Sequence, residues 1–171
     1  MDYHKRVVKM FQDSGIAFTK EEIAGIDYAD FGLDRIEIEG LNLIVYENND
    51  RYCAKEMVLL PGQTCPEHLH PPRNGEEGKR ETFRCRKGTV YLYVEGEKTP
   101  SVHSALPKGQ EKYYTVMHEV VLHAGEQYTI EPNTKHWFQA GSEGAVISEF
   151  SSPSDDASDI FTNPEIQRVI K

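Results

Sequence analysis

The chain has 171 residues, of which 38% are hydrophobic and 27% are charged, and its formal net charge is −9. This length allows one domain with a real core and is too short to expect two. The acidic excess argues against nucleic acid as the main partner, since phosphate binding needs clustered Lys and Arg, and no apolar run approaches the ~20 residues that cross a bilayer.

The cysteines and the N-terminus both favour a reducing cytoplasm as the location. Cys53, Cys65 and Cys85 form neither a CxxC pair nor the even set that disulfides require. The N-terminal segment lacks the small-residue cleavage site of a signal peptide. We therefore expect one domain over residues 1–171 that acts in the cytoplasm, with neither a membrane nor nucleic acid among its partners.

Two short helices are expected near the N-terminus. Apolar residues at helical spacing predict an amphipathic helix over residues 3–13, with Asp2 as the N-cap. Thr19 lies three residues before Glu22, a capping-box pattern that opens a second helix. Gly32 closes that segment.

From residue 35 the pattern changes to that of β-strands. Short segments rich in Val, Ile, Tyr, Phe and Thr are separated by turn pairs such as Asn-Asp, Pro-Gly and Ala-Gly. Many short strands with regular turns predict an all-β sandwich or barrel rather than alternating strands and helices. The expected strands cover residues 41–46, 51–60, 80–86, 89–95, 113–122, 127–130, 136–140 and 145–151.

The remaining segments set the expected boundaries of the domain. The longest breaks between strands, 71–79 and 96–112, are candidates for the border of a pocket. Asn163 followed by Pro164 predicts a short C-terminal helix, because Asn is a good N-cap and Pro suits the first helical position. The parts expected are a helical extension over about 1–34, a barrel over about 35–152 and a tail with a helix over 153–171.

A histidine pair in GQTCPEHLHPPR carries the strongest chemical signal. His68 and His70 are two residues apart in a stretch with strand character, so both point to one face with Leu69 opposite. Two imidazoles on one face suit a divalent metal, and Glu81 and His136 are candidates for the third and fourth ligands. For an HxH pair alone, the competing interpretation is a polar surface strand.

The two blocks that contain these residues resemble the motifs of the cupin superfamily. The first block runs from Gly62 to Gly88 and the second from Gly125 to His136. In the second block the usual Pro-x-Gly-x-x-His is shortened, because Pro132 lies only four residues before the histidine. The resemblance implies a small double-sheet β-barrel of the jelly-roll kind.

Four longer phrases narrow this resemblance: DRYCAKEMVLLPGQTCPEHLHPP, EGKRETFRCRKGTVYLYVEGEKTP, YTIEPNTKHWFQAG and SSPSDDASDIFTNPEI. Together they resemble the small bacterial D-lyxose isomerases over nearly the whole chain from about residue 28. The family resemblance implies conversion of D-lyxose to D-xylulose, with D-mannose and D-fructose as secondary substrates, usually with Mn²⁺. The metal ligands that it implies are His68, His70, Glu81 and His136.

The chemistry of such a reaction indicates two further candidates. Aldose–ketose isomerisation through a cis-enediol needs a base that reaches both carbons and a cation near the oxygens. Lys79 shares the strand face of Glu81, which suits contact with a substrate oxygen. Glu149 lies inside a strong strand, where a carboxylate is costly unless paired or facing a cavity. Glu149 is the first choice for the base and Glu67 the second, although solvent-exposed positions would also explain these residues.

Aromatic residues near the proposed ligands provide candidate sugar contacts. Tyr93, Trp137 and Phe138 could stack on the apolar face of a sugar or bond its hydroxyl groups, although core packing is the simpler interpretation. Imidazole and carboxylate select weakly among metals, so Co²⁺, Fe²⁺ and Zn²⁺ stay open beside Mn²⁺. Missing thiolate ligands disfavour a structural zinc site.

Three alternatives to a sugar isomerase stay open. A cupin dioxygenase would need a largely apolar pocket, and a phosphosugar isomerase would need an anion site, for which Arg73, Lys79 and Arg80 are available. The third alternative is a non-catalytic sugar-binding cupin. An apolar strand face at Val90, Leu92 and Val94 is expected to need covering by a second subunit, which predicts a homodimer.

Overall fold

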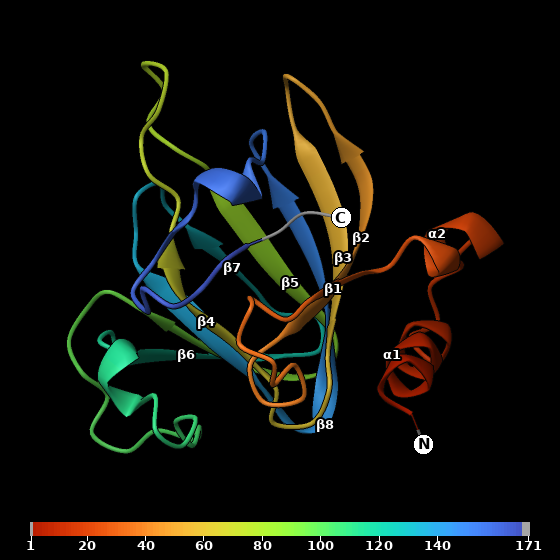
Figure 1. Ribbon diagram of the computed structural model, residues 1–171, viewed down its shortest axis with the longest axis horizontal. Coiled ribbons are helices and arrows are strands. Elements are labelled where there is room, and N and C mark those ends of the chain that lie inside the picture. Colours follow the sequence, from red (N-terminus) through yellow and green to blue (C-terminus); the bar gives the residue numbers. More distant parts are fainter. Residues whose placement is uncertain (1, 169–171) are drawn as a thin grey trace.

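The computed structural model describes residues 2–168 as a curled β-sheet with two helices beside it (Figure 1). The helices are α1 (Tyr3–Gln12) and α2 (Lys20–Ala24), and the loops contain two 3₁₀ turns, η1 (Glu111–Tyr113) and η2 (Asp156–Ser158). No helix in this part of the chain has the length and apolar character to span a membrane. The strands are β1 (Asp27–Ala29), β2 (Leu41–Asn48), β3 (Cys53–Leu59), β4 (Thr64–Leu69), β5 (Glu81–Val94), β6 (His118–His123), β7 (Gln127–Ile130), β8 (His136–Ser151) and β9 (Ile160–Phe161).

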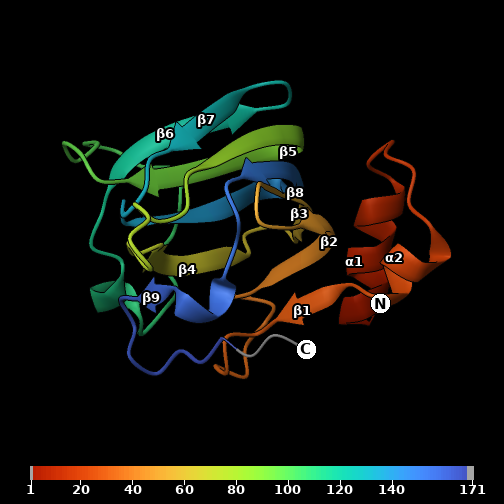
Figure 2. The ribbon, with the colours of Figure 1, turned by 90° about the horizontal axis from the view of Figure 1, so that it is seen from above.

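The long strands β5 and β8 join the two parts of the sheet. They pair antiparallel from Glu81 against Ser151 to Val94 against His136. The end of β8 also pairs with β3, and its beginning pairs with β4. On its other edge β5 pairs with β7 and then with β6. The sheet therefore curls around an interior, with α1 and α2 outside it (Figure 2).

Register shifts in β5 and β8 change which residues face the interior. In β5 they lie between Cys85 and Val90, so the inward side chains are odd-numbered before the shift and even-numbered after it. In β8 the change lies between Ala140 and Ala145, and the inward side chains are even-numbered before it and odd-numbered after it. A bulge moves every later side chain to the other face. The predicted strands 80–86 and 89–95 are thus one strand, as are 136–140 and 145–151.

Gly88 permits this shift in β5. Its φ is +76°, and a Cβ on it would lie 2.0 Å from the backbone oxygen of Gly144. We expect Gly88→Ala to destabilise the protein by more than the ~1–3 kcal/mol that left-handed strain costs, because the methyl group also meets backbone. Urea unfolding measures this loss. Gly109→Ala is the matched control, because Gly109 has φ +81° and a Cβ there would have nothing within 4 Å. An equal loss of stability in the two variants would show that the contact with Gly144 has no effect.

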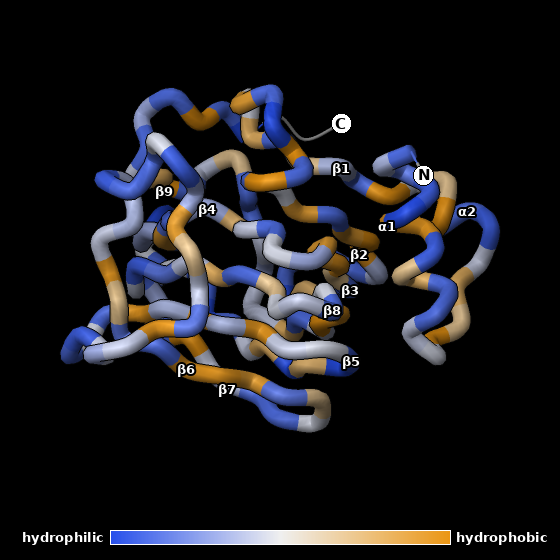
Figure 3. The backbone as a smooth tube through the Cα atoms, turned by 90° about the horizontal axis from the view of Figure 1, so that it is seen from below, coloured by the Kyte–Doolittle hydropathy of each residue, from blue (hydrophilic) through white to orange (hydrophobic). Residues whose placement is uncertain are grey.

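The interior core explains why one expectation about the surface is wrong. Val90, Leu92 and Val94 are at most 2% exposed and belong to the core inside the curled sheet, together with residues such as Phe83 and Ile147. They face inward because of the register shift in β5, so they form no outer face for a second subunit. Figure 3 shows hydrophobic positions along the strands, with a continuous run in β6.

The N-terminal helices cover the outside of the sheet. Val7 and Phe11 of α1 are fully buried against apolar residues of β2, β3 and β8, which confirms the amphipathic prediction. Asp2 occupies the N-cap of α1, but its side chain makes no capping hydrogen bond. The predicted capping box between Thr19 and Glu22 is present at α2.

Three boundary predictions are wrong. α2 ends at Ala24, and the stretch expected to be helical up to Gly32 contains strand β1, which pairs with β2. The predicted strand 113–122 begins only at His118. Within the described residues Asn163 is followed by a turn rather than a helix, although its side-chain oxygen accepts a hydrogen bond from the backbone N–H of Glu165 as an N-cap would. Residues 169–171 lie outside the described residues.

Candidate active site

Three buried imidazoles meet inside the curled sheet. His68 lies near the end of β4, His70 follows that strand, and His136 opens β8 opposite His68. One ring nitrogen from each of the three lies within 4.8 Å of the others. The structure thus brings together the histidines that sequence spacing singled out, although two of them are 66 or more residues from the third in the chain.

The rings of His68 and His136 are fixed by backbone carbonyl groups. His68 Nδ1 lies 2.8 Å from the oxygen of Pro66, and His136 Nδ1 lies 2.9 Å from the oxygen of Thr134. A carbonyl oxygen only accepts, so each Nδ1 carries a proton, and Nε2 is the ring atom that each histidine can offer to a metal. Burial, together with the neighbouring imidazoles, holds the pKa of His68 well below its usual range, so that ring is neutral as a metal ligand must be.

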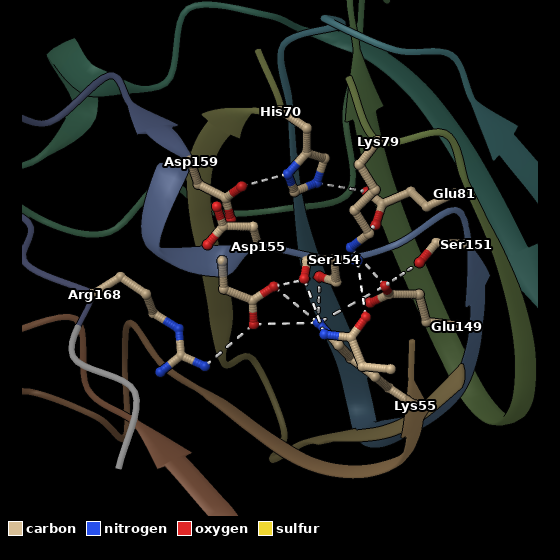
Figure 4. Close-up of polar contacts among 12 residues, drawn as sticks. Lys55, His70, Lys79, Glu81, Glu149, Ser151, Ser154, Asp155, Asp159 and Arg168 are labelled. Atoms are coloured by element: carbon tan, nitrogen blue, oxygen red, sulfur yellow. Dashed lines mark hydrogen bonds and ion pairs between the residues drawn. The ribbon is translucent and has the colours of Figure 1, made fainter. Parts of the chain in front are cut away.

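His70 lies between two carboxylates, as Figure 4 shows. Its Nδ1 is 2.5 Å from Asp159 Oδ1, and its Nε2 is 3.2 Å from Glu81 Oε1. Burial alone would lower the pKa of His70, but these two carboxylates raise it to about 9. Glu81 Oε1 also lies 3.0 Å from Nε2 of His136, so the carboxylate borders the imidazole cluster.

This donor set fits a divalent cation. The Nε2 atom of His136 is fully buried. Within residues 2–168 it is one of few buried side-chain nitrogen or oxygen atoms that lack a hydrogen-bond partner, although the Glu81 carboxylate lies at ion-pair distance. Three imidazoles and one carboxylate are ligands that Mn, Fe, Co and Zn accept. The three histidines could therefore hold a metal ion, with Glu81 beside them.

A lysine and a second carboxylate continue the cluster. Lys79 Nζ lies 2.7 Å from Glu81 Oε2 and 2.5 Å from Glu149 Oε1, and all three side chains are buried. Burial alone would lower the pKa of Lys79, but the carboxylates of Glu149 and Glu81 hold it well above its usual range. The same lysine, with His70, keeps the pKa of Glu81 well below its usual range in spite of burial.

A second buried lysine approaches Glu149 from the neighbouring strand. Lys55 on β3 pairs with Glu149 on β8, and its Nζ lies 4.0 Å from Glu149 Oε1 (Figure 4). Its close partner is Asp156 of η2, at 2.9 and 3.2 Å. Lys55, together with Lys79, keeps the pKa of Asp156 below its usual value although burial opposes this.

These groups surround a cavity of about 40 Å³. The cavity is lined by apolar side chains, including Phe83 and Phe138, and by polar groups of His68, Lys79 and Glu149. A wider depression of about 640 Å³ lies next to it, and Lys55 is among the residues that line both. The chemical groups therefore sit in a small interior space that adjoins a larger surface hollow.

Several predicted substrate contacts lie elsewhere. Tyr93 and Trp137 stack on each other, with ring centroids 3.9 Å apart, in a separate cluster that the stretch 96–112 helps to cover. The bulge in β5 turns Tyr93 outward, and Trp137 alternates with His136, so neither side chain lines the cavity. Only Phe138 does.

Glu67 also points away from the imidazoles. Its carboxylate accepts hydrogen bonds from the backbone of Thr115 and Val116 and from the hydroxyl of Thr162. These contacts tie β4 to a loop and to the C-terminal segment. Glu67 lies on the opposite face of β4 from His68, and its contacts give it a structural role.

Sequence reasoning missed four polar residues at the cavity: Lys55, Asp156, Asp159 and Arg168. Lys55 had a readable signal, because it shares a strand face with the buried Cys53 and Met57. The other three belong to the segment after β8, where no periodic pattern marks an inward face. Two of its aspartates, Asp159 and Asp156, are buried against His70 and Lys55.

Comparison with known proteins connects this geometry to a family. A family model described as D-lyxose isomerase matches residues 8–171. The chain is 64% identical over 168 residues to the D-lyxose/D-mannose isomerase of Thermosediminibacter oceani, which covers 98% of this chain and 93% of that protein.

Solved structures resemble the fold at low sequence identity. The L-ribose isomerase of Acinetobacter sp. DL28, in complex with L-ribose, has a TM-score of 0.79 and 17% identity over 96% of this chain and 91% of that one. An RmlC-like cupin from Shewanella frigidimarina has a TM-score of 0.52 and 15% identity over 83% and 93%. These likenesses confirm the predicted cupin barrel. The family match and the relative at 64% identity show that the chain belongs to the D-lyxose isomerase family and is a sugar isomerase that interconverts an aldose and a ketose.

Proposed function

We propose that the protein interconverts D-lyxose and D-xylulose, and secondarily D-mannose and D-fructose. We propose Mn²⁺ as the divalent metal that it uses. The relative at 64% identity, named for D-lyxose and D-mannose, supports the choice of sugars. The observation that carries the proposal is the row of contacts between buried groups, from the imidazoles through Glu81 and Lys79 to Glu149, at the border of one cavity. The proposed ligands are His68, His70, Glu81 and His136.

In this proposal Glu149 moves the proton between the two carbons. A cation held by the imidazoles would supply Lewis-acid polarisation of the sugar carbonyl. Glu149 takes the proton from C2 of the aldose and returns it to C1, which requires one carboxylate that reaches both atoms, while the hydroxyl proton of O2 passes to O1 and leaves C2 as the ketone. Its position on a rigid strand, held at one oxygen by Lys79, leaves the other oxygen for this transfer.

Lys79 acts as a hydrogen-bond donor rather than as a base. The adjacent carboxylates hold its pKa well above the usual value, so the amine stays protonated at neutral pH. A fixed ammonium group beside the cavity stabilises the negative charge that develops on the enediolate oxygens. This assignment gives the two residues separate roles that the sequence left open.

The alternatives are less well supported by the cavity. A dioxygenase pocket would be largely apolar, whereas charged groups line much of this one. A phosphate site is disfavoured because Arg80 pairs with Glu131 at the surface and Arg73 contacts Asp155 and the hydroxyl of Ser158. A sugar-binding protein without activity would not need a buried lysine held against Glu149.

A sugar panel on metal-stripped protein tests the proposal. With Mn²⁺ added back, we expect ketose formation from D-lyxose and D-mannose, no turnover of aldose phosphates, and no activity while a chelator is present. The same assay with Co²⁺, Fe²⁺ or Zn²⁺ in place of Mn²⁺ ranks the metals by the activity that they support. Full activity in excess chelator would refute the metal dependence, and turnover of a phosphosugar alone would refute the substrate class.

Location and assembly stay part of the proposal. We propose a cytoplasmic location and a homodimer. The exposed apolar residues Tyr46 on β2 and Phe150 on β8 support the homodimer, since the strand face at Val90, Leu92 and Val94 is buried. Sedimentation equilibrium measures the assembly state, and a monomer at working concentrations would exclude the dimer.

A further inference from the structure

The C-terminal segment 152–168, here called the tail, crosses the cavity and attaches to β4. Its strand β9 pairs with β4, with Phe161 opposite His68 and Ile160 opposite Leu69. The backbone N–H of Thr162 donates to the backbone oxygen of Glu67. The tail is thus hydrogen-bonded to the strand that carries the first histidine, although it is far from that strand in the chain.

The residue just before β9 touches an imidazole of the cluster. Asp159 Oδ1 lies 2.5 Å from Nδ1 of His70, and its side chain is only 9% exposed. His68 and His136 use backbone carbonyl groups within two residues of themselves for the same purpose. His70 alone of the three is held by a side chain, and that side chain comes from the tail (Figure 4).

We propose that Asp159 is a positioning residue for His70, and that docking of the tail on β4 completes the metal site. The inference rests on the proposed metal site. A carboxylate on Nδ1 fixes the ring tautomer, aims Nε2 at the other two imidazoles and strengthens the ring as a ligand. Removing such a partner costs about 10–100-fold in metal affinity.

The attachment of the tail to the rest of the protein keeps Asp159 in contact with His70. Besides β9, three contacts attach the tail to the rest of the protein. Asp156 pairs with Lys55, Arg168 lies 2.6 Å from Asp27, and the backbone N–H of Gln167 donates to the backbone oxygen of Phe31. Asp159 lies between these anchors, so its carboxylate is delivered to His70 when the tail is docked. Metal affinity therefore reports on the tail as well as on the ligands.

The test measures metal affinity in Asp159→Ala and Asp159→Asn. Co²⁺ and Mn²⁺ are titrated against a chelating dye at fixed pH, without substrate. We expect about 10–100-fold weaker binding in Asp159→Ala. Asp159→Asn keeps an oxygen that can accept the Nδ1 proton but loses the negative charge, so its metal affinity should lie between those of Asp159→Ala and the wild type. Because asparagine has the same shape as aspartate, this variant provides the test if Asp159→Ala does not fold.

Asp155→Asn is the matched control, because it removes one negative charge from the same tail at a side chain that pairs with Arg73 and not with an imidazole. Its affinity should stay within about threefold of the wild type, well short of the loss that a missing imidazole partner brings. Affinity in Asp159→Ala equal to that of the control would overturn the proposal.

Proton NMR of the Co²⁺-loaded protein adds a readout that general destabilisation does not move. Imidazoles bound through Nε2 give strongly shifted, exchangeable Nδ1–H signals, one for each of the three rings. The signal of His70 alone should exchange faster or disappear in Asp159→Ala. Three unchanged signals would contradict the role of Asp159, whereas wild-type protein that binds no Co²⁺ would contradict the proposed metal site itself.

Discussion

Replacing Glu149 with Gln is expected to lower the turnover of D-lyxose by ~10²-fold or more while metal affinity stays within a few-fold of the wild type, since this is the usual contribution of a general base. Glutamine keeps the size and one oxygen of the side chain but accepts no proton at neutral pH. Glu149 is 3% exposed, and its polar partners among residues 2–168 are Lys79, Lys55 and Ser151 rather than an imidazole, so its loss should leave the metal site assembled. Steady-state kinetics with saturating Mn²⁺ measures the change.

Isotope exchange separates this role from a general loss of structure. In deuterated water, wild-type protein should incorporate solvent deuterium at the carbon next to the carbonyl group, and Glu149→Gln should lose this exchange with the turnover. Glu143→Gln is the control, because Glu143 lies on the same strand but is exposed at the bulge. Wild-type turnover in Glu149→Gln would remove this carboxylate from the mechanism.

The convergence of the proposed site residues was predictable because it depends on local alternation and family motifs. His68, Glu81 and Glu149 each lie in a strand whose other inward residues are apolar, so a polar side chain there must face a cavity or a partner. Lys79, just before β5, could be placed beside Glu81 for the same reason. None of these assignments required knowledge of how the strands cross.

The faces of Tyr93 and Trp137 could not be predicted in the same way. The alternation rule holds only up to a bulge, and the shift at Gly88 depends on contact between two strands that are distant in the chain. Once β5 changes face, Val90 turns inward and Tyr93 turns outward. The sequence shows the glycine, but the partner at Gly144 becomes visible only when the strands are paired.

The tail was the least predictable part of the site. Asp156 and Asp159 lie in a segment with one 3₁₀ turn and a two-residue strand, where side-chain direction follows no period. Their burial depends on long-range partners, Lys55 and His70. A charged loop therefore looks the same in the sequence whether it is solvated or closes a cavity.

Lys79→Met is expected to destabilise the metal-free protein by about 3–5 kcal/mol, the usual cost of removing one partner from a buried ion pair. The ammonium group lies 2.7 Å from Glu81 and 2.5 Å from Glu149, and both carboxylates are at most 3% exposed. Methionine fills a similar volume but leaves these two charges without their shared cation. Urea unfolding in a chelator measures the loss, since a bound metal would otherwise neutralise Glu81.

A second substitution tests whether the loss comes from the stranded charges. Adding Glu149→Gln to Lys79→Met removes one of the two carboxylates, so the double variant should be more stable than Lys79→Met alone, a coupling of about 0.5–3 kcal/mol for residues in contact. Lys87→Met, at an exposed lysine of β5, should change stability by only about 0.5 kcal/mol. If the losses of Lys79→Met and Glu149→Gln simply add, packing rather than charge holds Lys79 in place, and its role beside the reacting sugar has to be assigned to another cation.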